Sequence, residues 1–333
     1  MTGPETLTPG KLLGISGAYW QTCTLHAAVK LDVVTAMGEG PVPAAVLAGK
    51  IDADPRALAM LLDALCAMDI LSKSGNDYAP TQPALKFLSK ASDGYIGHMI
   101  MHHHHLVESW SKMDQAVKTG KPVRTRSSFD DAEYRESFLM GMFNNAMGMV
   151  NQLVPTLDLS GRKHLLDLGG GPGTYAIHFC KYNPGLRATI YDLPTTRPFA
   201  EKTIHRFGQG DAVTFLDGDY IKDPVPGSYD VVWLSHILHG EGPVDCQRIV
   251  DKAVNALAAG GMIIIHEFIL NPERSGPLFP ALFSLNMLLG TESGQSYSET
   301  ELAGMLTLAG IGSITRTGFK GPTESGILLG VKP

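Results

Sequence analysis

The sequence predicts a two-domain α/β protein in which a mainly helical N-terminal domain precedes a doubly wound parallel sheet. The chain has 333 residues, more than a typical single domain. After residue 157, apolar strands alternate with helical segments, which requires crossover connections and a sheet covered on both faces. We expect domains at 1–95 and 157–333, joined by a helical linker at 96–156. The strands are expected at 165–169, 188–193, 213–219, 229–238 and 261–270.

The composition is that of a globular protein in a reducing compartment. Hydrophobic residues make up 44% of the chain, charged residues 18%, and the formal net charge is −6, which argues against a general nucleic-acid surface. No apolar run is long enough to span a bilayer, and no N-terminal signal pattern is present. We therefore expect a cytoplasmic protein without a nucleic-acid or membrane partner. The cysteines lack metal-like spacing and are Cys23, Cys66, Cys180 and Cys246.

Residues 11–37 form an apolar pattern at helical spacing with few charges. A helix that is hydrophobic on several faces needs a partner surface. We expect this helix to lie between the two subunits of a homodimer, around Tyr19, Trp20 and Leu25. His26 within it is interpreted as a core or interface residue.

A helix, a turn containing Asp-Pro, a second helix and a hairpin follow, in VPAAVLAGKI, DADP, RALAMLLDALCAMDI and LSKSGNDYAPT. This is a winged-helix-like pattern, and such modules often bind DNA, so a ligand-sensing regulator is the competing class of protein. The second helix carries Arg56 as its only strong base, whereas phosphate neutralisation needs several cations. We interpret the module as a dimerisation domain.

The linker contains two helical patterns, at 97–110 and 129–154. The first holds four consecutive histidines, His102 to His105. Neighbours on a helix point about 100° apart, so at most two of them share a face, and this run alone does not predict a metal site. The second pattern contains FNNAM, with Phe143 and Met147.

The stretch HLLDLGGGPGT at 164–174 predicts a buried strand, a glycine loop and the start of a helix. Gly169, Gly171 and Gly173 let the backbone pass close to a ligand, and the helix aims its N–H groups at it. A glycine loop alone is weak evidence. About 20 residues further on, Asp192 ends the next strand, where a carboxylate can accept both hydroxyls of a ribose. Together these features predict a nucleoside-binding site.

The series DLGGGPG, YDLP, GDY, LSHILH and AAGGMIIIHEFIL resembles the motifs of S-adenosylmethionine-dependent methyltransferases. More narrowly, the chain is similar over nearly its whole length to the two-domain O-methyltransferases related to caffeate, hydroxyindole and polyketide methyltransferases. The resemblance implies a Rossmann-like methyltransferase sheet, a winged-helix-like dimerisation domain, and S-adenosylmethionine as cofactor with S-adenosylhomocysteine as product. ITRTGF and GILLGVK predict a closing antiparallel hairpin, which favours this class over a dinucleotide-dependent dehydrogenase.

The cofactor contacts implied by this resemblance and by the strand ends are Asp167, Gly169, Gly171, Gly173, Asp192, Leu193, Asp219, Tyr220 and Ser235. His239, just after the fourth strand, occupies the place of the family's catalytic histidine, and imidazole is the natural base near neutral pH. Glu267 matches one of the acids that flank that histidine. The expected substrate pocket comprises His102, His105, Phe143, Met147, His236 and Tyr297.

The chain departs from the family pattern in two places. Gly240 follows His239 where plant members have Asp, and the stretch matching the second flanking acid carries Ser296 and Tyr297. These departures leave open methylation of an activated carbon, with or without a metal ion held by the histidines near this edge. The preferred interpretation assigns no metal. It is methyl transfer to a hydroxyl of a small aromatic or polyketide-like acceptor, with His239 as general base and Glu267 orienting it.

Overall fold

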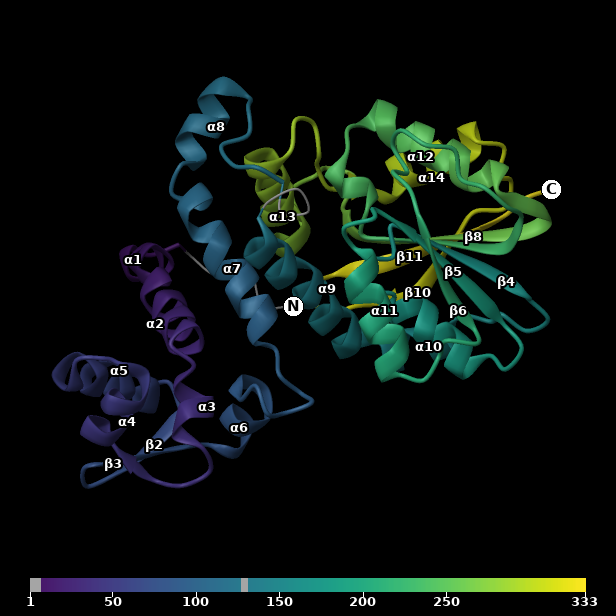
Figure 1. The fold of residues 1–333 in the computed structure, drawn as a ribbon. Helices are drawn as coiled ribbons and strands as arrows, with labels where there is room; N and C mark the ends of the chain where they lie inside the picture. The colour runs from purple at the N-terminus through teal and green to yellow at the C-terminus, as the bar shows by residue number, and fades with distance from the viewer. Residues whose placement is uncertain (1–6, 127–130) are drawn as a thin grey trace. The chain divides into compact units, whose positions relative to one another are not determined.

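The computed structural model describes residues 7–126 and 131–333, which form two compact units that divide between Leu106 and Val107 (Figure 1). The elements of each unit follow the apolar patterns of its own sequence. No helix among these described residues is long and apolar enough to cross a membrane.

The first unit begins with three helices where the sequence predicted one. They are α1 (Pro9–Gly17), α2 (Tyr19–Lys30) and α3 (Val33–Met37). The prediction of a single helix was wrong mainly because Asp32 adopts a left-handed backbone, with φ +55°, and separates α2 from α3. Aspartate tolerates this conformation better than most residues, so the chain turns there.

The predicted helix–turn–helix and hairpin are present. Asp54 caps α5 (Pro55–Ala67) by accepting a hydrogen bond from the Ala57 N–H at 2.8 Å. The strands form a three-stranded antiparallel sheet in the order β1-β3-β2. The remaining elements of this region are α4 (Ala44–Ile51), β1 (Val42–Pro43), β2 (Leu71–Ser74), β3 (Asp77–Pro80), α6 (Gln82–Leu88) and α7 (Gly97–Trp110).

The second unit opens with the helices α8 (Met113–Thr119) and α9 (Ala132–Leu153), followed by the short η2 (Val154–Thr156). Asp131 caps α9 through the N–H groups of Glu133 and Tyr134. The helix predicted at 129–154 is therefore confirmed from Ala132 onward, whereas residues 129–130 lie outside the described part.

The main sheet of the second unit has the order β10-β11-β8-β7-β4-β5-β6. Its parallel strands are β4 (His164–Leu168), β5 (Arg187–Asp192), β6 (Val213–Asp217), β7 (Tyr229–Ser235) and β8 (Leu257–Leu270). The predicted closing hairpin is confirmed: β11 (Ser325–Val331) runs antiparallel to β8, and β10 (Thr315–Lys320) antiparallel to β11. The short β9 (Tyr297–Ser298) pairs with the end of β8.

Helices cover both faces of this sheet, as the apolar strands require (Figure 1). Side chains such as Leu165 and Trp233 pack against α9 and α10 (Thr174–Tyr182), with α11 (Arg197–Arg206) beside them. Side chains such as Leu166 and Ile265 pack on the opposite face against α12 (Pro243–Asn255) and α14 (Glu299–Leu308). The strand order reverses between β4 and β7, and ligands of doubly wound sheets bind at that point.

Candidate active site

The glycine loop after β4 has the open backbone that the sequence predicted. Gly169, Gly171 and Gly173 all have positive φ, at +69°, +55° and +78°. A Cβ at Gly173 would lie 2.2 Å from Ile190 Cδ1, so packing requires glycine there. A Cβ at Gly171 would meet no protein atom within 4 Å. This face of the loop is therefore a cradle that can admit a ligand.

Asp192 lies at the end of β5 with its carboxylate turned to the loop. Oδ2 accepts a hydrogen bond from the Gly171 N–H at 2.8 Å. Oδ1 accepts from the Leu193 N–H at 2.7 Å and from the Thr196 hydroxyl at 3.1 Å. Burial raises the pKa of Asp192, and these bonds oppose the rise. Among the described residues Oδ2 accepts this one hydrogen bond, so its second lone pair can accept another from a ribose hydroxyl beside the cradle.

Asp167 supports the loop from below. It is almost completely buried, and its Oδ2 accepts a hydrogen bond from the Ala176 N–H of α10 at 3.3 Å. A Cβ on Gly170 would lie 2.5 Å from its carboxyl carbon, so loop and carboxyl are in close contact. Burial raises the pKa of Asp167 to about 7. A direct contact between Asp167 and the cofactor stays a prediction.

The segment after β6 holds the two residues predicted at the adenine end. Asp219 Oδ1 accepts hydrogen bonds from the Ile221 and Lys222 N–H groups, so its carboxylate caps its own turn. The Tyr220 ring is the neighbour that a Cβ on Gly169 would meet at 3.2 Å. Burial raises the pKa of Tyr220 to about 12. Tyr220 therefore borders the glycine loop, whereas Asp219 shapes the turn beside it.

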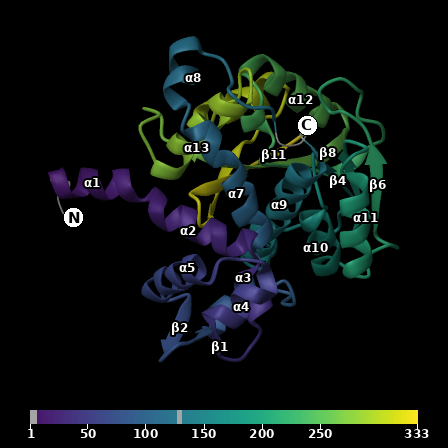
Figure 2. The same cartoon turned by 60° about the vertical axis from the view of Figure 1, so that its left-hand side comes forward.

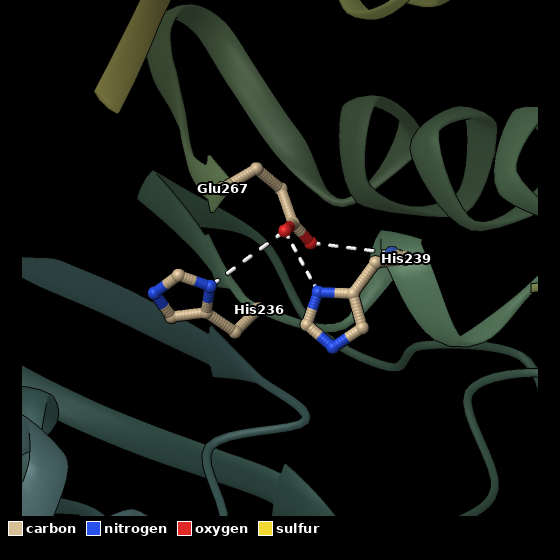
Figure 3. Close-up of side chains that lie close together, drawn as sticks. All are labelled: His236, His239 and Glu267. Atoms are coloured by element: carbon tan, nitrogen blue, oxygen red, sulfur yellow. Dashed lines mark hydrogen bonds and ion pairs between the residues drawn. The ribbon is translucent and has the colours of Figure 1, made fainter. Parts of the chain in front are cut away.

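His239 and Glu267 form a hydrogen-bonded pair at the carboxyl ends of β7 and β8. His239 lies in η3 (Leu238–Gly240), and its Nδ1 is 2.8 Å from Glu267 Oε2 (Figure 3). Glu267 Oε1 accepts from the Leu238 and His239 N–H groups at 3.0 and 3.3 Å, and Oε2 also accepts from the Phe268 N–H at 3.1 Å. The Nδ1 proton points at the carboxylate, so Nε2 keeps a lone pair and can accept a proton.

The charge on Glu267 is well stabilised. The side chain is only 2% exposed. Burial by itself raises the pKa of a carboxyl, but the imidazoles of His239 and His236 outweigh it and hold the pKa of Glu267 well below its usual range. Glu267 is therefore an ionised, fixed acceptor for the His239 ring.

The strand before His236 ends three residues earlier than the sequence predicted. The strand expected to reach residue 238 stops at Ser235, because His236 takes a left-handed backbone with φ +56°. This turn aims its Nδ1 at Glu267 Oε2, 3.6 Å away (Figure 3). The His236 ring lies against the Phe268 ring, tilted by 34°, with 4.2 Å between the ring centres. Neither ring nitrogen has a hydrogen-bond partner in the described structure. Burial lowers the pKa of His236.

His266 points to the other side of β8, as alternation along a strand requires. Its Nδ1 lies 3.0 Å from the Ser235 hydroxyl and its Nε2 3.0 Å from the Ser325 hydroxyl. Of the three histidines at this edge of the sheet, His236 and His239 therefore face Glu267, whereas His266 is hydrogen-bonded to two serines. Ser235, predicted as a cofactor contact, has this bond to His266 as its described role.

An aromatic wall, which the sequence analysis missed, lines the His239 ring. Phe283 lies 4.7 Å from it, ring centre to ring centre, and Phe268 and Phe279 continue the wall at 4.6 and 4.9 Å between neighbouring rings. Phe279 and Phe283 come from α13 (Leu278–Gly290). Their spacing of four residues on one helix face was the available signal. The wall presents apolar ring surface beside His239.

Tyr297 supports the loop after His239. Its hydroxyl donates to the Glu241 carbonyl oxygen at 2.6 Å, and the side chain is buried. Ser296 donates through its hydroxyl to the Pro280 carbonyl oxygen at 2.8 Å. The position of the second flanking acid is therefore occupied by residues that tie α13 and the η3 loop to the sheet.

The other predicted pocket residues have described contacts elsewhere or belong to the first unit. Phe143 contacts Phe207 at the C-terminal end of α11, 6.3 Å between ring centres. Met147 is partly buried and packs against the core on the face of the sheet that α9 and α10 cover. His102 and His105 lie in α7, within the first unit. Their roles at a substrate stay predictions.

A methyltransferase sheet with its closing hairpin, a glycine cradle and an acid at the second strand end together define an S-adenosylmethionine-dependent methyltransferase. Residues 112–312 match the O-methyltransferase domain and residues 13–90 the O-methyltransferase dimerisation domain. The chain belongs to this O-methyltransferase family and uses S-adenosylmethionine as its cofactor.

Two relatives and one solved structure illustrate the similarity. The chain is 31% identical to 3-hydroxy-5-methyl-1-naphthoate 3-O-methyltransferase of Streptomyces sahachiroi, covering 99% of this chain and 97% of the relative. It is also 31% identical to the tetracenomycin polyketide synthesis 8-O-methyl transferase TcmO of Streptomyces glaucescens, over 98% and 97%. The structure of PigF with SAH superposes with a TM-score of 0.89 at 27% identity, over 98% and 100%; PigF is a protein of Serratia sp..

Proposed function

We propose that the protein methylates a hydroxyl of a small aromatic or polyketide-like acceptor and that His239 removes the hydroxyl proton. The observation that carries the proposal is the bond between His239 Nδ1 and the buried, ionised Glu267. It holds the imidazole in the tautomer whose Nε2 is a proton acceptor. The relatives named for a naphthoate hydroxyl and for a polyketide support the acceptor class.

The chain offers a matching set of groups to the cofactor. When bound, S-adenosylmethionine supplies an activated methyl group for in-line displacement. We expect Asp192 Oδ2 to accept a hydrogen bond from a ribose hydroxyl of the cofactor. The open space at Gly171 would admit the methionine part of the cofactor, and Tyr220 would border its adenine. Asp167 and Asp219 then act mainly by shaping the two loops that make these contacts.

The wall of Phe268, Phe279 and Phe283 suits a flat acceptor beside His239. A ring packed on this wall is held in one plane, and fixing the orientation of the attacking oxygen lowers the entropic part of the barrier. The wall also keeps water from the His239 side that faces it. As the hydroxyl loses its proton, the imidazolium that forms is stabilised by Glu267 at 2.8 Å.

The proposal includes a homodimer formed through the first unit, whose winged-helix-like elements serve dimerisation and not DNA binding. The matching dimerisation family and the apolar exposed surface of α1 and α2 support it. All four cysteines are free, which supports a cytoplasmic location.

The test compares His239→Ala with the unchanged protein on a panel of aromatic hydroxyl compounds, with isotopically labelled S-adenosylmethionine. Loss of a general base typically lowers turnover by about two to four orders of magnitude. Affinity for S-adenosylhomocysteine, measured by calorimetry, should change less than threefold. Label found on a ring carbon, or turnover that survives the substitution, would contradict the proposal.

A further inference from the structure

His236, His239 and Glu267 form a cluster of three ligand-bearing side chains at one end of the sheet (Figure 3). One ligand atom from each lies within 4.8 Å of the other two. The two Nδ1 atoms face the same carboxylate oxygen, Oε2, from 3.6 and 2.8 Å. The three donor atoms therefore lie close together, brought there by the turn after β7, by η3 and by β8.

The donor set is that of a transition metal. Two imidazoles and a carboxylate bind zinc at about 2.0–2.2 Å, which places neighbouring ligand atoms about 3.3 Å apart. The two distances to Glu267 Oε2, 2.8 and 3.6 Å, lie on either side of that value. His236 has two unpartnered nitrogens that are fully enclosed, so a cation there displaces no hydrogen bond of that residue. Magnesium and calcium prefer oxygen ligands, and the cluster offers them only one carboxylate.

We propose that this cluster binds a divalent cation of the zinc class and that this binding switches the enzyme off. The cation would take His236 Nδ1, His239 Nδ1 and Glu267 Oε2 as ligands and leave a further position for water. The inhibitory half rests on the proposed role of His239 as base. The binding half rests on the cluster alone.

Inhibition follows from the proton inventory of His239. Nδ1 must give up its proton to bind the cation. Because a neutral imidazole carries a single N–H, the ring changes to the tautomer protonated at Nε2, with no net loss of a proton. Nε2 is the atom that would have to take the proton of the substrate hydroxyl, and it then has no lone pair to do so. A bound cation therefore leaves His239 without a free lone pair on either ring nitrogen, and the ring can no longer act as the base.

Binding is tested on the whole protein, stripped of metal, with Co²⁺ as a spectroscopic probe and Zn²⁺ in calorimetry. We expect one equivalent to bind and the visible Co²⁺ bands of a nitrogen-containing site to appear. His236→Asn should weaken Zn²⁺ binding at least tenfold, and asparagine suits the left-handed backbone at this position. His205→Asn, on the exposed end of α11, is the matched control and should leave the affinity unchanged.

Inhibition is tested by the Zn²⁺ concentration that halves the rate, relative to each variant's own metal-free rate. It should match the calorimetric dissociation constant, rise at least tenfold in His236→Asn, and exceed millimolar for Mg²⁺. A His236→Asn affinity equal to that of the unchanged protein overturns the site, and a rate that requires added metal overturns the inhibition. If Co²⁺ binds at the cluster but His239→Ala keeps full activity, the site stands and the proposed base fails.

Discussion

At the scale of single residues, the site depends on Glu267, a buried carboxylate with no free oxygen. Three backbone N–H groups and the His239 ring donate to its two oxygens. Each donor favours the ionised form, and together with the neighbouring imidazoles they overcome the cost of burial. The carboxylate consequently fixes both the position of the η3 backbone and the tautomer of the His239 ring.

Glu267→Gln should therefore lower turnover strongly, by about two orders of magnitude or more. A glutamine can present an N–H to His239 Nδ1, which moves the ring proton to Nε2 and blocks the base. The measurement is steady-state turnover, with the binding of S-adenosylhomocysteine as a check on the fold. Glu241→Gln is the control, because Glu241 pairs with Arg126 and leaves the His239–Glu267 bond intact. Equal losses in the two variants would argue against an orienting role.

Asp167 leads to a prediction about stability and pH. Its pKa is raised by burial to about 7 in the folded protein and is close to 3.8 in the unfolded chain. Between these pH values the folded state binds more protons at this group than the unfolded chain does. The contribution of Asp167 to the free energy of unfolding therefore falls as the pH rises from about 4 to about 7 and is constant above that. Asp167→Asn removes this dependence. In denaturant unfolding of the cofactor-free protein, the variant should gain roughly 2 kcal/mol relative to the unchanged protein between pH 5 and pH 7. A relative stability that does not change with pH would contradict the buried neutral carboxyl.

At the scale of elements, the glycine loop is the feature that the sequence predicted best. The glycine-rich loop between a strand and a helix, together with Asp192 at the next strand end, predicted the cradle, and the apolar strands predicted that both faces of the sheet are covered. The end of β7 was predicted too late, because a histidine with a positive φ has no signature in the sequence. The Phe279 and Phe283 wall was missed, because the contact between α13 and η3 depends on tertiary packing. The break at Asp32 was missed for a similar reason.

Gly171→Ala tests the cradle. No protein atom lies within 4 Å of the position that a Cβ on Gly171 would take. The substitution therefore costs only backbone strain, about 1–2 kcal/mol at φ +55°. The new methyl group would, however, fill the space expected for the cofactor. We expect calorimetric affinity for S-adenosylhomocysteine to fall at least tenfold.

Gly185→Ala is the matched control for this variant. Gly185 also has a positive φ, +92°, and open space at its Cβ, but it lies in the turn before β5, away from the loop. It should lose comparable stability and keep its cofactor affinity. Equal affinities in the two variants would place the cofactor elsewhere.

At the scale of the whole molecule, the feature that requires explanation is the exposed apolar surface of the first two helices. α1 contains no buried residue, and it extends beyond the rest of its unit (Figure 2). Leu13, Ile15, Tyr19 and Trp20 are each at least 60% exposed. Monomeric proteins rarely leave such a contiguous surface in water. The match of residues 13–90 to a dimerisation domain supports the proposal that this surface lies in a homodimer interface.

The double variant Leu13→Glu, Trp20→Glu should dissociate the proposed homodimer, because burying two carboxylates in an apolar interface costs several kcal/mol. Light scattering after size exclusion, at micromolar concentration, should give twice the chain mass for the unchanged protein and the single chain mass for the variant. Leu308→Glu, on an equally exposed leucine of α14, should leave the mass doubled. A monomer mass for the unchanged protein at every concentration would refute the dimer, and a doubled mass for all three proteins would move the interface away from α1 and α2.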